Sequence, residues 1–326
     1  MSSLVTPAQI AAAAEGMRGR VRVTPCEYSP QLSARWGVEL YAKLENFQVT
    51  GSFKARGAHH FIARALTEAA PVRGVITYSS GNHGRAVAEA AAAHELPALI
   101  TVPESIDGQK ARAIDAAGAE RIVAGNTSES RKSRALEIAA ERGWTIVPPF
   151  DHDWIIEGQS TVAAEVLEDC PEVTDLWAPV GGGGLSAGSA LAISTLAPHV
   201  QLHTVEPEGA PGYAQSAAAG ERVTLPATDS IADGLLPLVI GERNWAWLHR
   251  VGANPHLVED GRIARVLGLF HEEFEIPAEP SGVVSSVPLL DAIDSDPIEP
   301  GVHVAIVSGG NIDPARLARL LGKAST

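Results

Sequence analysis

Four consecutive glycines, Gly181, Gly182, Gly183 and Gly184, constrain the fold of this chain more than any other feature of its sequence. They follow the strand-like run 175–178 and open a segment that predicts a helix through Leu196. Four glycines lose much backbone entropy on ordering, so a folded chain keeps them mainly where another group approaches the backbone closely. N–H groups at the start of a helix suit a phosphate. A flexible linker is the alternative, but linkers are rarely followed at once by a helix.

The glycine run does not match the common nucleotide-binding motifs. No Gly-Lys-Ser/Thr follows it, and the glycine spacing of the dinucleotide fingerprint is absent. A second polar turn, residues 79–84 (Ser-Ser-Gly-Asn-His-Gly), lies between an apolar run at 74–77 and an alanine-rich segment at 85–94 that predicts a helix. Its N–H and hydroxyl groups suit a carboxylate or a phosphate. A simple helix cap explains the turn equally well.

A lysine, Lys54, stands in an unusual frame at residues 43–57. The small and polar residues at 48–52 let the backbone pass close to a ligand, and a helix-compatible segment follows at 55–66. A lysine amine becomes a useful nucleophile when desolvation or nearby cations lower its pKa, and it can then hold an aldehyde as a Schiff base. Taken alone, a lysine at the start of a helix is usually a solvated surface charge.

These motifs occur together in a known order. The Lys54 frame, the turn at 79–84, the glycine run and Val-Ser-Gly-Gly-Asn at 307–311 follow one another as in the fold-type II pyridoxal phosphate enzymes. The chain resembles that group over about residues 5 to 322, and is most similar to its serine/threonine dehydratase and serine racemase branch. The resemblance implies a two-domain, tryptophan synthase β-like α/β fold. It further implies a large domain of residues 1–49 and 148–326, with a small domain of residues 50–147 inserted into it.

Composition agrees with such an enzyme. The chain has 326 residues and 45% hydrophobic residues, enough to bury a sizeable core. Its net charge of −14 argues against nucleic acid or an anionic membrane as partner. The N-terminus lacks a signal-peptide core, no apolar run could span a bilayer, and the two cysteines have no metal or redox spacing. We therefore expect a cytoplasmic protein.

Strand-like and helix-like segments alternate along the chain, which predicts parallel sheets covered by helices. The predicted strands are residues 75–78, 98–102, 121–123, 145–147, 175–178, 202–205 and 302–307.

The resemblance implies a role for each cofactor-binding residue. Lys54 would hold pyridoxal 5′-phosphate as a Schiff base and, once freed by the substrate, would remove its α-proton. The amides of Gly181 to Gly184 would bind the phosphate. Asn82 would hydrogen-bond the phenolic oxygen, and Phe53 would pack against the ring, although ordinary core packing also explains a phenylalanine there. Ser308 would face the ring nitrogen; a serine that caps the next helix is the alternative.

The hydroxyl of Ser308 bears on the reaction. A serine can donate to a neutral pyridine nitrogen, whereas a carboxylate would keep that nitrogen protonated and make a stronger electron sink. The weaker sink favours prompt loss of a β-leaving group or proton exchange over transamination.

The same resemblance implies substrate contacts. Ser79 and the turn through Ser80, Gly81, Asn82 and His83 would bind the α-carboxylate. Ser80 matches the second base of serine racemase, on the ring face opposite the lysine, although a turn hydrogen bond also explains a hydroxyl there.

A charged residue outside the turn bears on the kind of substrate. Arg131 matches an arginine that closes onto the second carboxylate of dicarboxylates, a task suited to bidentate binding. It raises 3-hydroxyaspartate as a substrate, while a solvated helix arginine is the alternative.

Two departures from the family pattern limit the analogy. Where relatives have His-Pro, this chain has Pro148 and Pro149, so Phe150 or Trp154 would instead shape the pocket. Relatives also bind a magnesium- or calcium-type cation. Here Glu206 and the carbonyl of Ala210 are present, but glycine replaces the aspartate at position 212, which weakens the site.

Together these features predict a pyridoxal phosphate-dependent ammonia-lyase, expected as a homodimer, that acts on a hydroxy amino acid such as threonine, serine or 3-hydroxyaspartate. The products would be a 2-oxo acid and ammonia. A serine or aspartate-type racemase is the first alternative, and a non-catalytic pyridoxal phosphate-binding protein is the second.

Overall fold

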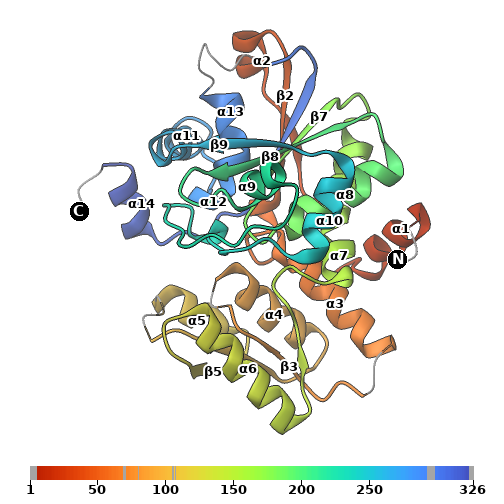
Figure 1. The fold of residues 1–326 in the computed structure, drawn as a ribbon, viewed down its shortest axis with the longest axis vertical. Coiled ribbons are helices and arrows are strands. Elements are labelled where there is room, and N and C mark those ends of the chain that lie inside the picture. The colour runs from red at the N-terminus through yellow and green to blue at the C-terminus, as the bar shows by residue number, and fades with distance from the viewer. Residues whose placement is uncertain are drawn as a thin grey trace.

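The computed structural model describes residues 6–68, 71–79, 81–104, 106, 108–291 and 298–322. Within these residues the strands form a six-stranded sheet, in the order β1-β2-β10-β7-β8-β9, and a four-stranded sheet, in the order β5-β4-β3-β6. The larger sheet lies in the upper half of Figure 1 and the smaller sheet in the lower half. Neighbouring strands run parallel except β1 and β2, which confirms the predicted α/β class with parallel sheets.

The strands of the larger sheet are β1 (Cys26–Tyr28), β2 (Glu39–Leu44), β7 (Asp175–Pro179), β8 (Gln201–Pro207), β9 (Asn254–Val258) and β10 (Val302–Val307). Those of the smaller sheet are β3 (Val75–Thr77), β4 (Ala98–Val102), β5 (Glu120–Val123) and β6 (Thr145–Ile146). Each predicted strand is present, with ends shifted by at most two residues. The prediction misses β1, β2 and β9.

Four helices accompany the smaller sheet: α3 (Lys54–Glu68), α4 (Asn82–Ala93), α5 (Gly108–Ala116) and α6 (Ser128–Arg142). The remaining α-helices of the described residues are α1 (Pro7–Gly16), α2 (Pro30–Trp36), α7 (Asp153–Asp169), α8 (Gly184–Leu196), α9 (Gly212–Ala219), α10 (Glu242–Val251), α11 (Asp260–Glu272), α12 (Pro280–Val283), α13 (Val287–Leu290) and α14 (Pro314–Leu320). Short 3-10 turns are η1 (Glu45–Phe47), η2 (Asp233–Leu235) and η3 (Val284–Ser286). Among the described helices, none is long and apolar enough to cross a membrane.

Both faces of the larger sheet are buried at its central strands. Along β10, Val304 and Ile306 enter a core cluster with residues of α7 and α8, while Ala305 and Val307 enter a second cluster with residues of α11, α12 and α13. Successive residues of a strand point to opposite faces, so an unbroken apolar run is what a doubly covered strand requires. This is why the strand at 302–307 is predictable from sequence.

The smaller sheet is built in the same way. Val75 of β3 packs in a cluster with residues of α3 and α4, whereas its neighbour Ile76 packs against residues of α6. All four strands of this sheet lie within residues 75–146, inside the range predicted for the inserted domain. The domain boundaries at residues 50 and 147 stay a prediction.

A buried group of charges joins the start of α3 to the rest of the chain. Arg56 lies in the first turn of α3 and is fully buried. Its Nη2 is 2.7 Å from Oε1 of Glu45, and its Nη1 is 2.5 Å from Oε1 of Glu165 on α7. Lys43 of β2, also buried, is 2.8 Å from Oε2 of Glu165. The segment 43–45 and helix α7 therefore fix the first turn of α3.

The pKa of the Glu45 carboxyl shows how strongly Arg56 stabilises its charged form. Burial alone would raise its pKa, but the charge and hydrogen bonds of Arg56 outweigh burial and hold the pKa below the ordinary 4.5. A depressed pKa in the folded state adds stability above the unfolded pKa, and that stability is lost as pH falls through the folded pKa. The contribution of Glu45 is therefore present at neutral pH and is lost progressively as pH falls below the ordinary pKa of 4.5 and through the lower folded pKa.

We predict that Arg56→Met destabilises the protein strongly, because it leaves a buried carboxylate without its partner. Breaking a buried pair costs about 3–5 kcal/mol, and urea unfolding at pH 7 measures the loss. The matched control is Arg142→Met, which breaks an exposed pair with Glu120 and should cost less than about 1 kcal/mol. Equal losses in the two variants would contradict this interpretation of the Arg56 network.

Candidate active site

Lys54 begins α3 and lies where the two sheets meet. Its Nζ donates a 2.7 Å hydrogen bond to the carbonyl of Pro149 and lies 5.0 Å from the centroid of the Phe53 ring. The N–H of Phe53 donates to the carbonyl of Ser308 at 3.1 Å, and Ser52 forms an antiparallel bridge with Gly309. The lysine frame is therefore tied to the segment that follows β10.

The Lys54 amine is chemically unusual. Burial lowers its pKa from 10.5 to about 8, because the charged form loses its solvation. A lysine with such a pKa is partly neutral near physiological pH, as a nucleophile or a proton acceptor must be.

The glycine run lies between β7 and α8, as predicted, and its backbone is closely packed. A Cβ on Gly182 would lie 2.2 Å from Cδ1 of Phe150, and one on Gly181 would lie 2.9 Å from Cα of Leu235. Gly183 has φ +89°, a conformation that residues with side chains rarely adopt. The first amides of a helix have no partner within it, so this loop can bind an anion with its backbone alone.

The turn after β3 has a similar constraint. A Cβ on Gly84 would lie 1.8 Å from the carbonyl oxygen of Ser79, so the chain there is too tight for any other residue. Burial lowers the pKa of His83 to about 3, and its Nε2 lies 3.1 Å from the carbonyl oxygen of Val147. His83 is therefore neutral, and anion binding by this turn would rely on its amides and hydroxyls. Ser80 lies outside the described residues.

Asn82 is the first residue of α4 and reaches toward the larger sheet. Its Nδ2 donates to Oε1 of Glu279 at 2.5 Å, and its Oδ1 accepts from Nδ2 of Asn311 at 2.8 Å. A Cβ on Gly309 would lie 2.3 Å from Oε1 of Glu279 and 3.2 Å from Nδ2 of Asn82. Asn82 therefore packs directly against the segment that carries Ser308.

Ser308 directly follows β10 and is buried. Its backbone is fixed by a hydrogen bond from its N–H to the carbonyl of Gly282 at 3.1 Å. Among the described residues its hydroxyl makes a single long contact of 3.4 Å, to the carbonyl of Ser281. A hydroxyl held this weakly is available to a ligand.

Arg131 lies on α6, away from the residues described so far in sequence. Its guanidinium donates to the carbonyl of Asn126 at 3.0 Å and to the hydroxyl of Ser128 at 3.1 Å. Its Nε is buried and has no hydrogen-bond partner among the described residues. Burial lowers the pKa of Arg131, and no described carboxylate forms an ion pair that would offset this.

The two metal-ligand candidates are engaged in a helix cap. The carboxyl of Glu206 accepts from the amides of Tyr213 at 2.7 Å and Ala214 at 2.8 Å, at the start of α9. The carbonyl of Ala210 accepts from Gly212 at 3.0 Å. Burial raises the pKa of Glu206 to about 7 despite these donors. The described residues contain no group of three or more His, Cys, Asp or Glu suited to a metal, and a divalent cation here stays a prediction.

Phe150, one of two residues expected to shape the pocket, covers the glycine run. The sequence predicts no role for Glu279, which contacts Asn82, or for Asn311, which belongs to a predicted motif and also contacts Asn82. Trp154, the other residue expected to shape the pocket, packs against Phe61 and His152, and its place at the pocket stays a prediction. Only tertiary packing reveals these pairings.

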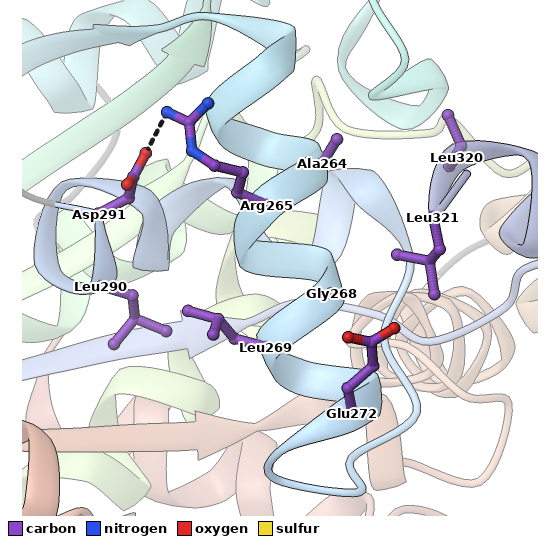
Figure 2. A pocket seen from close by; sticks show the side chains of 9 residues that line it. All are labelled: Ala264, Arg265, Gly268, Leu269, Glu272, Leu290, Asp291, Leu320 and Leu321. Atoms are coloured by element: carbon purple, nitrogen blue, oxygen red, sulfur yellow. Dashed lines mark hydrogen bonds and ion pairs between the residues drawn. The ribbon is translucent and has the colours of Figure 1, made fainter. Parts of the chain in front are cut away.

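A separate surface pocket lies between α11, α13 and α14 (Figure 2). Arg265 and Asp291 form an ion pair of 2.7 Å at one end, and Leu269 and Leu290 form its apolar side. It includes none of the predicted catalytic, cofactor-binding or substrate-binding residues. It is therefore distinct from the candidate active site.

The site just described fits pyridoxal phosphate. It combines a desolvated lysine, a side-chain-free loop at a helix start, and a weakly engaged buried hydroxyl. The family model described as "Pyridoxal-phosphate dependent enzyme" matches residues 17–309, and the chain belongs to this family. Within it, the chain falls in the serine/threonine dehydratase and racemase branch of fold type II.

Individual proteins support this placement. The chain is 37% identical over 296 residues to serine racemase from Oryza sativa subsp. indica, covering 90% of this chain and 87% of that protein. It is 34% identical over 301 residues to L-threo-3-hydroxyaspartate ammonia-lyase from Saccharomyces cerevisiae, covering 92% and 91%. The solved structure of maize serine racemase superposes with a TM-score of 0.91 at 33% identity, covering 97% of each chain.

These similarities establish that the protein is an enzyme of the serine/threonine dehydratase-like type and that its cofactor is pyridoxal phosphate. They remove the alternative of a protein that only binds the cofactor. The roles of individual residues stay predictions.

We predict that the cofactor-free protein attaches pyridoxal phosphate covalently through Lys54, with a rate that rises with pH and levels off above about pH 8. The rise follows the neutral amine, since the protonated form cannot attack an aldehyde. Absorbance after mixing gives the rate, and borohydride followed by mass spectrometry locates the bond. Lys54→Ala should form no covalent product. A rate still rising steeply at pH 10 would mean that the amine is not desolvated.

Proposed function

We propose that this protein is an ammonia-lyase that converts a β-hydroxy amino acid to a 2-oxo acid and ammonia. The observation that carries the proposal is the nature of Ser308, a buried and weakly engaged hydroxyl next to the lysine frame. The similarity to a yeast protein named as a hydroxyaspartate ammonia-lyase supports it.

Different residues of the chain would bind the cofactor and the substrate. The loop from Gly181 to Gly184 would bind the cofactor phosphate, Asn82 would donate to its phenolic oxygen, and Phe53 would pack against its ring. Ser79 and the turn amides through Gly81 and His83 would hold the α-carboxylate of the substrate.

The amine of Lys54 would accept the α-proton at Nζ, which its lowered pKa permits near neutral pH. When bound, pyridoxal phosphate supplies an electron sink that makes this proton removable. The net reaction removes the α-hydrogen and the β-hydroxyl as water and leaves an enamine. Its imine tautomer then reacts with water to give the 2-oxo acid and ammonia.

Ser308 favours elimination over transamination. A hydroxyl can donate to an unprotonated pyridine nitrogen but carries no charge to keep that nitrogen protonated. The negative charge developing at the α-carbon would then be poorly delocalised, so the β-leaving group departs promptly.

Arg131 supports a substrate with a second carboxylate. Its guanidinium is partly desolvated, its Nε is buried without a partner in the described chain, and burial lowers its pKa. An incoming carboxylate would relieve each of these costs, since guanidinium and carboxylate form paired charge-assisted hydrogen bonds. We therefore propose 3-hydroxyaspartate as the substrate that best fits, with threonine and serine as the simpler candidates.

We predict that Arg131→Gln lowers kcat/KM for 3-hydroxyaspartate by about 10- to 100-fold, the usual value of a charge-assisted hydrogen bond. Elimination of threonine should change by less than about threefold, because threonine lacks the second carboxylate. A coupled 2-oxo-acid and ammonia assay measures both. Arg134→Gln, on the same helix with an exposed pair to Glu137, is the matched control. Equal effects of Arg131→Gln on both substrates would contradict the proposed contact between Arg131 and the second carboxylate.

Racemisation is the second candidate function. The similarity to rice serine racemase is as high as that to the ammonia-lyase. Ser80, whose counterpart in serine racemase is the second base, would return a proton to the face opposite Lys54. A homodimer is proposed for the assembly by the same likeness.

We predict that, if Ser80 is this second base, L-serine incubated in deuterated water yields deuterated D-serine. Ser80→Ala should then lower D-serine formation by ~10²–10⁴-fold while L-elimination stays largely intact. Chiral chromatography measures both. Absence of D-serine with the unchanged protein would leave elimination as the sole reaction, and an equal loss of elimination in Ser80→Ala would assign Ser80 to the shape of the turn.

A further inference from the structure

A continuous series of side-chain hydrogen bonds runs from the surface of α4 to the candidate active site. Nη1 of Arg85 donates to Oδ1 of Asn311 at 2.7 Å. Nδ2 of Asn311 donates to Oδ1 of Asn82 at 2.8 Å, and Nδ2 of Asn82 donates to Glu279 at 2.5 Å. Arg85 and Asn82 lie one helical turn apart on α4, whereas Asn311 and Glu279 come from segments beside the larger sheet.

The polarity of this series is fixed by its ends. A guanidinium can only donate, so the amide of Asn311 must turn its oxygen toward Arg85 and its NH₂ group toward Asn82. The carbonyl of Thr50 accepts a second hydrogen bond from Nδ2 of Asn311 at 2.8 Å and fixes the same orientation. Asn82 must then present its oxygen to Asn311, so its NH₂ group faces the other way.

We propose that Arg85 and Asn311 are positioning residues that hold the donor side of Asn82 toward the cofactor. The inference rests on the proposed contact between Asn82 and the cofactor's phenolic oxygen. An amide can turn either its oxygen or its NH₂ group to a ligand with nearly the same shape. Only the NH₂ group would stabilise the ionised phenolic oxygen.

Besides fixing the orientation of the two asparagine amides, Arg85 strengthens the hydrogen bonds that they donate. Hydrogen bonds in series polarise one another, so a charged donor at one end strengthens each donor further along. Arg85 is half-buried, and its charge also acts on the carboxyl of Glu89 on the same helix, but its described side-chain hydrogen bond goes to Asn311. The Asn82 amide would therefore be a better donor than an isolated asparagine.

A structural tie is the competing explanation, because the same bonds join α4 to the segment after β10. The two explanations differ for Asn311→Asp, which has nearly the same shape. A carboxylate at position 311 keeps the contact with Arg85 and adds an ion pair, which offsets part of the tie that is lost at Thr50 and Asn82. The carboxylate cannot donate to Asn82 or to the Thr50 carbonyl, so the polarity is reversed.

The test measures cofactor binding without substrate. Cofactor-free protein is titrated with pyridoxal phosphate to obtain Kd. The ratio of the bound cofactor's two absorbance bands reports the ionisation of its phenolic oxygen. We expect Asn311→Asp to raise Kd about tenfold or more and to shift the bands toward the protonated form. The thermal stability of its cofactor-free form is measured alongside, and a structural tie alone predicts a lower stability without the spectral shift.

Two substitutions at Arg85 test the series from its other end. Arg85→Met should raise Kd about threefold to tenfold with the same spectral shift, because the donor is lost. Arg85→Gln can still donate through its NH₂ group and should recover part of both. Arg142→Met, which removes the same charge from an exposed pair on α6, is the control and should change neither.

Unchanged Kd and absorbance in Asn311→Asp would overturn the proposal and leave these residues as a structural tie. If Asn311→Asp does not fold, Arg85→Met decides alone, since unchanged Kd and absorbance there also overturn it. Normal cofactor binding by the unchanged protein, without elimination of any hydroxy amino acid, would count against the proposed function only. The two failures are therefore distinguishable.

Discussion

The buried ion pairs of Arg56 hold the candidate active site in place. Arg56 stands two residues after Lys54, and its partners Glu45 and Glu165 come from η1 and α7. Desolvating these charges is costly, and their attraction offsets the cost only when the geometry is good. The first turn of α3 therefore has one favourable position, and the lysine amine is held at the junction of the two sheets rather than in solvent.

The part of the fold that sequence predicts is the part buried on both faces. The strand at 302–307 is an unbroken apolar run because helices cover each side of it. The missed strands β1 and β9 lie at the sheet edges and are largely exposed, so they lack such a run. In β2 the run is interrupted by Lys43, whose burial is offset by ion pairs with Glu165 and Asp169 of α7.

The same distinction applies to the candidate site. The glycine run and the turn at 79–84 are predictable because each motif consists of consecutive residues. Both lie at the start of a helix, as expected. The cover of Phe150 over Gly182 and the contact of Glu279 with Asn82 join residues far apart in the chain. Local sequence contains no signal for such pairings, because they arise only when the two sheets come together.

The close packing around Gly182 and Gly84 leaves no room for a larger side chain at these two positions, whereas other positions of the site can be substituted. At each glycine, even one added carbon would meet fixed atoms. Arg131 lies on the half-exposed first turn of a helix, where many side chains fit. Libraries built for directed evolution of new substrate preferences should therefore vary the surroundings of Arg131 and leave both glycines untouched.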